Sequence, residues 1–190
     1  MNNLGVKKLN LETNRQNISL LAFLVFIISP IASLPFILFS IYCKERFGLF
    51  VLSLFGGIVS YSIIPSWDLD LSRYYLLYDE ISKGGYSSFI DVVGRSNDYA
   101  FFFIYYIFSL VGFQFQFMLL ILSTLLFYIS FLVFDLIIKR FNTTRSNYFL
   151  LFTCFLLSLP VLALVSVTRF SMGYSFFMIF VYFRLINKNK

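Results

Sequence analysis

Histidine is absent from this chain of 190 residues. Its absence removes the commonest general base, the Ser-His and Cys-His nucleophile pairs, and most zinc sites. The two cysteines, Cys43 and Cys154, lie far apart in apolar runs without metal-binding spacing, so we expect small buried residues rather than a disulfide. No phosphate-binding glycine loop or dinucleotide fingerprint occurs. The sequence therefore predicts no metal and no cofactor.

Charged residues are also scarce. They make up 13% of the chain, whereas 59% is hydrophobic and 22% aromatic, and a soluble domain is usually about 25% charged. A water-soluble fold of this length could not bury so much apolar surface. The long apolar runs predict an all-α, polytopic integral membrane protein with about five to six membrane helices and one outer-face loop.

The few charges are unevenly placed. The chain has a net charge of +6, yet residues 66–98 hold six acidic and three basic side chains and are net −3. Because basic residues favour the cytoplasmic side of a membrane, we expect this acidic segment outside. The same rule explains the basic excess without a nucleic acid partner. We expect one membrane domain (1–190) with a cytoplasmic tail (1–17), first spans (18–65), an outer loop (66–98) and the remaining membrane helices (99–187).

Two apolar runs contain breaks that determine how many times the chain crosses the membrane. Run 18–43 is either one tilted helix or a hairpin folded at Ser29-Pro30, and the hairpin is favoured because it places the basic tail inside. Run 99–111 is long enough for about half a bilayer and ends at Gly112. We therefore expect it to dip into the membrane and return, or to lie at the outer surface.

Four other runs are long enough to cross a bilayer, namely 47–67, 113–138, 148–167 and 170–186. Within the first, Gly56-Gly57 would let a neighbouring helix approach closely, and Trp67 stands at the end as an interfacial anchor. Near the end of the second, Asp135 precedes Lys139 by four residues. This spacing predicts a structural ion pair.

The outer loop has the pattern of a helix. Apolar side chains recur at helical spacing over 71–81, which predicts a short amphipathic helix on the membrane surface with its tyrosines in the interface. Asp79 and Lys83 form an i,i+4 pair, and Gly84-Gly85 is expected to end the helix. A second short helix is expected at 87–93. The apolar positions of the first are Leu71, Tyr74, Tyr75, Tyr78 and Ile81.

Four ionisable residues collect at the expected outer face, namely Asp68, Asp70, Arg73 and Arg169. Arg169 interrupts two apolar runs, where an arginine usually pairs, lines a polar cavity or binds an anion. Two interpretations stay open for Arg169: it reaches water from a short outer turn, or it holds phosphate oxygens with Arg73 as its partner. Asp68 and Asp70 are either helix caps or a base for a sugar hydroxyl.

Three stretches of the chain together resemble one known family. The first, PSWDLDLSRYYLLYDE, has a proline, acidic residues and an Arg-Tyr pair just after an early span. The second, NDYAFFFIYYIFSLVGFQFQF, is a half-length aromatic run, a glycine break and the start of a span. The third, SVTRFSMGYSFFMIFVYF, carries Arg169 before small and aromatic residues. In order and spacing they resemble the Wzy-type polysaccharide polymerases and the related EpsG-like family.

The resemblance implies an activity. Such proteins join oligosaccharide repeat units carried on undecaprenyl pyrophosphate, at the outer face of the bacterial cytoplasmic membrane, to make O-antigen, capsule or exopolysaccharide. It implies that Arg73 and Arg169 hold the pyrophosphate, and that Asp68 or Asp70 is the base or orients Arg73. The implied partners are the lipid-linked oligosaccharide, membrane lipid, and a chain-length regulator or flippase. The implied sugar or lipid contacts are Tyr74 and Tyr75.

Members of this family are usually longer, with further spans and a second large outer loop. The chain resembles their N-terminal part, so we expect a truncated form. Three other functions stay open, namely a non-catalytic membrane subunit of the same pathway, a ligase that moves finished polymer to another acceptor, and a transporter. A transporter would often carry internal repeats around midplane charges, and the sequence has no evident repeat.

Overall fold

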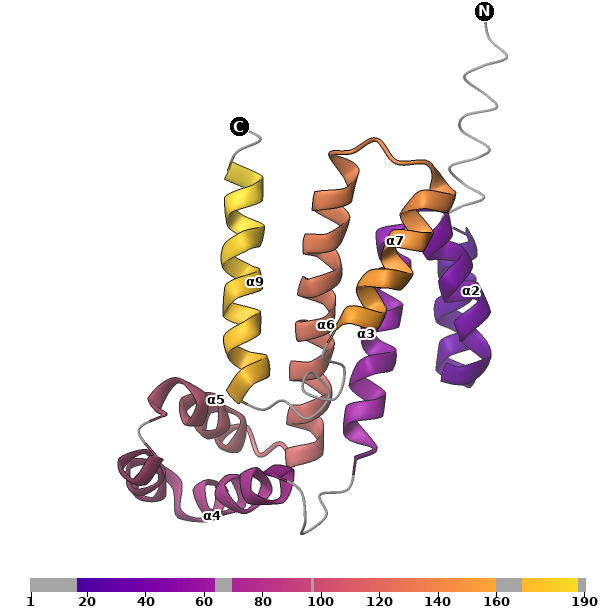
Figure 1. The fold of residues 1–190 in the computed structure, drawn as a ribbon. Helices are drawn as coiled ribbons and strands as arrows, with labels where there is room; N and C mark the ends of the chain where they lie inside the picture. Colours follow the sequence, from indigo (N-terminus) through magenta and orange to yellow (C-terminus); the bar gives the residue numbers. More distant parts are fainter. Residues whose placement is uncertain (1–16, 64–69, 97, 160–168, 188–190) are drawn as a thin grey trace, which may run out of the picture. The chain divides into compact units, whose positions relative to one another are not determined.

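The computed structural model describes residues 17–63, 70–96, 98–159 and 169–187. Every regular element in these ranges is an α-helix (Figure 1), which confirms the predicted all-α class. The chain divides into two compact units. Unit 1 comprises Met1–Phe55, Phe127–Pro160 and Phe177–Lys190, and unit 2 comprises Gly56–Leu126 and Val161–Phe176.

Unit 1 contains a helical hairpin. The helix Asn17–Ile28 and α2 (Pro30–Tyr42) are separated by Ser29, whose backbone is extended (φ −152°, ψ 106°). The Ser29 side chain caps α2, and a proline follows at the first helical position. The hydroxyl oxygens of Ser19 and Ser40 are 2.7 Å apart, whereas one continuous helix would separate them by about 30 Å. The hairpin is therefore confirmed, and the single tilted helix is wrong.

A buried carboxylate joins three helices within unit 1. The helices are α3 (Arg46–Tyr61), α6 (Phe115–Lys139) and α7 (Arg145–Ser158). Oδ2 of Asp135 accepts hydrogen bonds from Lys139 Nζ at 2.7 Å and Arg46 Nε at 3.0 Å. Its Oδ1 accepts one from Tyr148 Oη at 3.1 Å. The predicted pair of Asp135 and Lys139 is confirmed, and two further partners join it.

In unit 2, α4 (Asp70–Ser96) is divided at Gly85, whose backbone leaves the helical region (φ 62°, ψ −138°). Glycine adopts this conformation readily because it has no Cβ atom. The break confirms the predicted helix end at Gly84-Gly85, and a second helical part follows it, as expected. The predicted pair is also confirmed, since Asp79 Oδ2 lies 2.7 Å from Lys83 Nζ.

The apolar face of α4 is covered by α5 (Tyr99–Leu110). The rings of Tyr74 and Phe101 pack edge to face with centroids 5.1 Å apart, and Tyr78 also packs against α5. Helix α5 therefore buries Tyr74 and Tyr78, and the expected place of the helix in a membrane interface stays a prediction. Tyr75 is 39% exposed. The buried members of the predicted face are Leu71, Tyr74, Tyr78 and Ile81.

One helix of the described residues is long and apolar enough to cross a membrane, namely α6 with 25 residues. It follows α5 after a turn at Gly112 (φ 77°), which confirms the predicted glycine break. Four further apolar helices have 10–17 residues and are shorter than a span. The expected number of membrane helices therefore stays a prediction. The shorter helices are Asn17–Ile28, Pro30–Tyr42, Arg46–Tyr61 and Tyr99–Leu110.

The last described helices are α7 and α9 (Arg169–Asn187). Helix α7 covers the first part of the predicted run 148–167, and residues 160–168 lie outside the described residues, as does Trp67. Both cysteines are free thiols. The expected burial is confirmed for Cys43 and wrong for Cys154, which lies on an exposed side of α7.

Gly57 allows a close approach between α3 and α6 within unit 2. A Cβ atom at this position would lie 2.8 Å from the carbonyl oxygen of Leu120 and would overlap the hydroxyl of Thr124. The backbone of a helix cannot shift cheaply to make room for it. The close packing predicted for Gly56-Gly57 is therefore confirmed at Gly57.

We expect Gly57→Ala to lower the midpoint of thermal unfolding of the purified protein, because overpacking costs about 1–3 kcal/mol. Gly94→Ala is the matched control, since Gly94 is also helical and a Cβ atom there has no neighbour within 4 Å. That control should leave the midpoint unchanged or raise it. Scanning fluorimetry of the three proteins measures the midpoints. Equal midpoints for the wild type and Gly57→Ala would contradict the tight contact.

Candidate functional site

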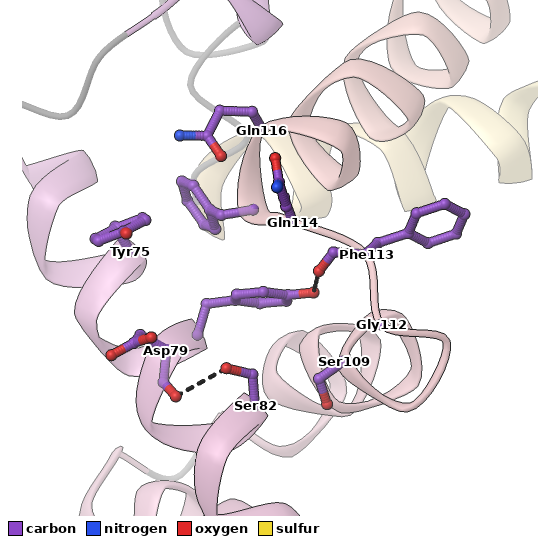
Figure 2. Close-up of a pocket in the computed structure, with 10 residues that line it drawn as sticks. Tyr75, Asp79, Ser82, Ser109, Gly112, Phe113, Gln114 and Gln116 are labelled. Atoms are coloured by element: carbon purple, nitrogen blue, oxygen red, sulfur yellow. Dashed lines mark hydrogen bonds between the residues drawn. The ribbon is translucent and has the colours of Figure 1, made fainter.

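A hollow of about 520 Å³ lies in unit 2 between α4 and the turn that joins α5 to α6. Figure 2 shows polar side chains of α4 on one side of it and the start of α6 on the other. The residues that line it are Tyr75, Tyr78, Asp79, Ser82, Ser109, Gly112, Phe113, Gln114, Phe115 and Gln116.

Helical spacing explains the α4 side of the hollow. Tyr75, Asp79 and Ser82 follow one another at intervals of four and three residues, which places them on one flank of the helix. Across from them, the left-handed backbone at Gly112 turns the chain back into α6. Gln114 is exposed just before α6 begins, so its amide is open to a ligand in the hollow (Figure 2).

Aromatic rings form the floor of the hollow. The ring centroid of Phe115 is 5.5 Å from that of Tyr75 and 5.6 Å from that of Tyr78. Tyr78 Oη donates a hydrogen bond of 2.6 Å to the carbonyl oxygen of Phe113 (Figure 2). Burial raises the pKa of the Tyr78 phenol above its ordinary value, so this group is a neutral donor at physiological pH. The bond ties α4 to the turn between α5 and α6.

Asp79 is the acidic residue of the hollow. Its Oδ2 accepts a hydrogen bond from Lys83, and this bond together with the charge of Asp79 raises the pKa of the Lys83 ammonium. The side chain of Asp79 is 40% exposed, so the carboxylate is open to a ligand as well as to the lysine. The hydroxyl of Ser82 donates to the Asp79 carbonyl and keeps its lone pairs for a further donor (Figure 2).

These groups define what the hollow can bind. Hydroxyls, amides and one carboxylate lie around the exposed ring of Tyr75, which matches a ligand with many hydroxyl groups and an apolar ring face. No group of three metal-ligating side chains occurs among the described residues. The arrangement can therefore hold a hydroxyl-rich ligand by hydrogen bonds from its hydroxyl, amide and carboxylate groups.

The predicted site residues are only partly gathered here. Tyr75 lines the hollow, whereas Tyr74 is buried against α5. Arg73 is exposed and precedes Tyr75 by two residues, so it lies about 160° around α4 from it. Asp68 lies outside the described residues, and Asp70 is the first residue of α4, with its side chain not described. Arg73 and Tyr75 therefore face different sides of one helix.

Arg169 is the first residue of α9, and its side chain is not described. The predicted pairing of Arg169 with Arg73 around a phosphate group therefore stays a prediction. The same holds for Asp68 and Asp70 as base or cap.

Sequence reasoning missed most of the hollow. It assigned Asp79 only to an ion pair and did not single out Ser82, Ser109, Gln114 or Gln116. One signal was present, because two glutamines alternate with phenylalanines directly after the predicted break at Gly112. Amides in an otherwise apolar run indicate a polar contact at that end of the following helix.

No family model, curated protein or solved structure matches this chain. The candidate site therefore rests on the chain's own residues and their geometry.

We expect Tyr78→Phe to destabilise the protein by about 1 kcal/mol, because the Phe113 carbonyl loses its side-chain donor. Tyr86→Phe is the control, since Tyr86 lies on the same helix with an exposed ring. Thermal unfolding of both variants should show a lower midpoint for Tyr78→Phe by about 2–4 °C. A midpoint shared by the two variants would mean that the hydrogen bond does not hold α4 in place.

Proposed function

We propose that this chain is a multi-pass protein of the bacterial cytoplasmic membrane that polymerises undecaprenyl-pyrophosphate-linked oligosaccharide repeat units into a surface polysaccharide. The observation that carries the proposal is the hollow of hydroxyl, amide, carboxylate and aromatic groups at the N-terminal end of α6. Sugars present the complementary hydroxyls and apolar ring faces. The resemblance of three sequence stretches to polysaccharide polymerases points to the same class of substrate.

The surface of the helices supports a membrane location. Many large apolar side chains are exposed, although monomeric soluble proteins rarely expose large contiguous apolar patches. Helix α6 has the length and hydropathy of a span, and Lys139 and Arg140 follow at its C-terminal end. Positive residues favour the cytoplasm, so the C-terminal end of α6 would face inward. The most exposed apolar side chains include Ile28, Ile31, Phe141, Leu157 and Phe180.

The proposed reaction needs a base and a cationic clamp, and it needs no metal. An acceptor hydroxyl attacks the anomeric carbon of a lipid-linked sugar, the bond from that carbon to the pyrophosphate oxygen breaks, and the pyrophosphate leaves with the electron pair. A carboxylate takes the hydroxyl proton. Arginine side chains stabilise the charge that develops on the leaving pyrophosphate. Arg73 and Arg169 are the proposed clamp, and Asp79 joins Asp68 and Asp70 as a proposed base.

One alternative has specific support from the hollow. Asp79 is bound to Lys83, which is compatible with a site that only binds sugar and transfers nothing. The chain would then be a non-catalytic subunit of the same pathway. Chain extension by this protein distinguishes the two functions, because a binding subunit cannot extend the polymer by itself.

We expect Arg73→Ala and Arg169→Ala each to lower chain extension by about 10²-fold or more, since each removes a cation from the leaving group. The test expresses the chain in a strain without its own polymerase but with the matching repeat-unit pathway, and displays the polysaccharide on a gel. The wild type should give a ladder, and each variant should give single repeats. Arg184→Ala, an exposed arginine near the other end of α9, should keep the ladder. Intact ladders in both variants would refute the clamp.

We expect Asp79→Asn to reduce extension by about 10²-fold in the same assay, because an amide cannot take the acceptor proton. Asp91→Asn is the matched control, an exposed aspartate in the second part of α4 that does not line the hollow. Immunoblots of membranes check that each protein is present in equal amount. Equal ladders from the two variants would exclude Asp79 as the base.

A further inference from the structure

Two turns of unit 1 are fastened to each other, namely the α2–α3 turn and the α6–α7 turn. Lys44 in the first donates a hydrogen bond to the carbonyl oxygen of Thr143 in the second, and its Nζ lies 5.5 Å from the centre of the Tyr148 ring. Each turn contains a non-glycine residue with a left-handed backbone, Lys44 (φ 63°) and Asn142 (φ 45°). Such conformations persist where the surroundings determine them, so both turns are held in a defined shape.

The joined turns carry an excess of positive charge, which we name the basic cluster. Its five cations are Lys44, Arg46, Lys139, Arg140 and Arg145. The acidic groups beside them are Glu45 and Asp135, so the net charge is +3. Asp135 is buried and already accepts hydrogen bonds from Arg46 and Lys139. The cluster therefore has more basic than acidic side chains.

The cations that bind Asp135 still reach the surface. The Arg46 side chain is 55% exposed, and only its Nε contacts the carboxylate. The Lys139 side chain is 40% exposed. Helices α3 and α7 both begin with an arginine and have no acidic residue in the first turn, so their positive dipole ends add to the charge of the cluster. An anion would relieve this accumulated positive potential.

We propose that the basic cluster binds the phosphate of an anionic phospholipid headgroup. This inference rests on the proposed membrane location but not on the proposed reaction. A lipid is favoured over a free phosphate because the cluster lies at the C-terminal end of α6, the helix with the length of a span. Phe141, in the same turn as Arg140, is 70% exposed, and Leu150 on α7 is also exposed. They offer apolar contacts to the acyl chains next to a headgroup.

The test measures lipid retained by the purified full chain in detergent, by native mass spectrometry, with phosphatidylglycerol or phosphatidylcholine added. The wild type should retain phosphatidylglycerol and not phosphatidylcholine. Arg140→Gln combined with Arg145→Gln should weaken phosphatidylglycerol binding by about tenfold or more, since two basic residues that attract the anionic headgroup are removed. The two substitutions keep Arg46, Lys139 and Tyr148, which donate the hydrogen bonds to Asp135 described above.

The control removes the same amount of charge elsewhere. Lys83→Gln combined with Arg95→Gln, on α4 of unit 2, should bind phosphatidylglycerol as the wild type does. Equal retention of both lipids by the wild type, or equal loss in both double variants, would overturn the proposal. Displacement of the lipid by inorganic phosphate at matched concentration would assign the cluster to a free anion and overturn it too. The single variant Arg145→Gln should weaken phosphatidylglycerol binding by a smaller factor than the double variant. It replaces the double variant in the test if the double variant does not fold.

Chain extension has no part in this experiment. Binding of phosphatidylglycerol without a polysaccharide ladder would support the lipid site and refute the proposed function. A polysaccharide ladder without a preference for phosphatidylglycerol would support the proposed function and refute the lipid site.

Discussion

The burial of a single carboxylate fixes the arrangement of unit 1. Asp135 is fully buried, and burying an ionised carboxylate is costly unless donors surround it. Arg46, Lys139 and Tyr148 supply those donors from three helices. The start of α3 and the start of α7 must therefore lie beside the end of α6. The contact between the α2–α3 and α6–α7 turns follows from this requirement, and so does the position of the basic cluster.

Unit 2 is held together in a different way. Its described contacts around the hollow are aromatic, and the hydrogen bond from Tyr78 to the Phe113 carbonyl joins α4 to the turn before α6. The hydroxyl of Ser82 keeps its lone pairs, and the exposed amide of Gln114 has both donors and an acceptor. A site for a neutral, hydroxyl-rich ligand is compatible with this arrangement, whereas the cations of unit 1 suit an anion.

Sequence reasoning predicted the features that depend on residues close together in the chain. The pairs Asp135–Lys139 and Asp79–Lys83 follow from helical spacing, and the breaks at Ser29, Gly85 and Gly112 follow from local backbone chemistry. The features that it missed depend on how distant segments meet. Arg46 reaches a carboxylate 89 residues away, and no local pattern indicates that contact.

The candidate site shows the same limit. Of the six residues proposed from the sequence, Tyr75 is the one that lines the hollow in the described part of the chain. Sequence reasoning placed Tyr75 beside Tyr74 and Arg73 because they are neighbours in the chain. In a helix, however, the side chains of consecutive residues point in directions about 100° apart. Residues that are neighbours in the sequence therefore face different sides of the helix. The other side of the hollow is formed by residues 112–116, because the turn at Gly112 brings them close to Tyr75.

The position of Arg73 on the far side of α4 bears on the size of the proposed substrate. A small ligand inside the hollow cannot also contact Arg73, because the helix lies between them. A lipid-linked oligosaccharide is longer, since several sugar rings separate its outer end from its pyrophosphate. The hollow and Arg73 can therefore serve one reaction only if they hold different parts of an extended substrate, or if the hollow holds the acceptor while Arg73 holds the pyrophosphate of the donor. Polymerisation uses an extended lipid-linked donor and a separate acceptor. Hydrolysis or transport of a single small sugar uses neither of them.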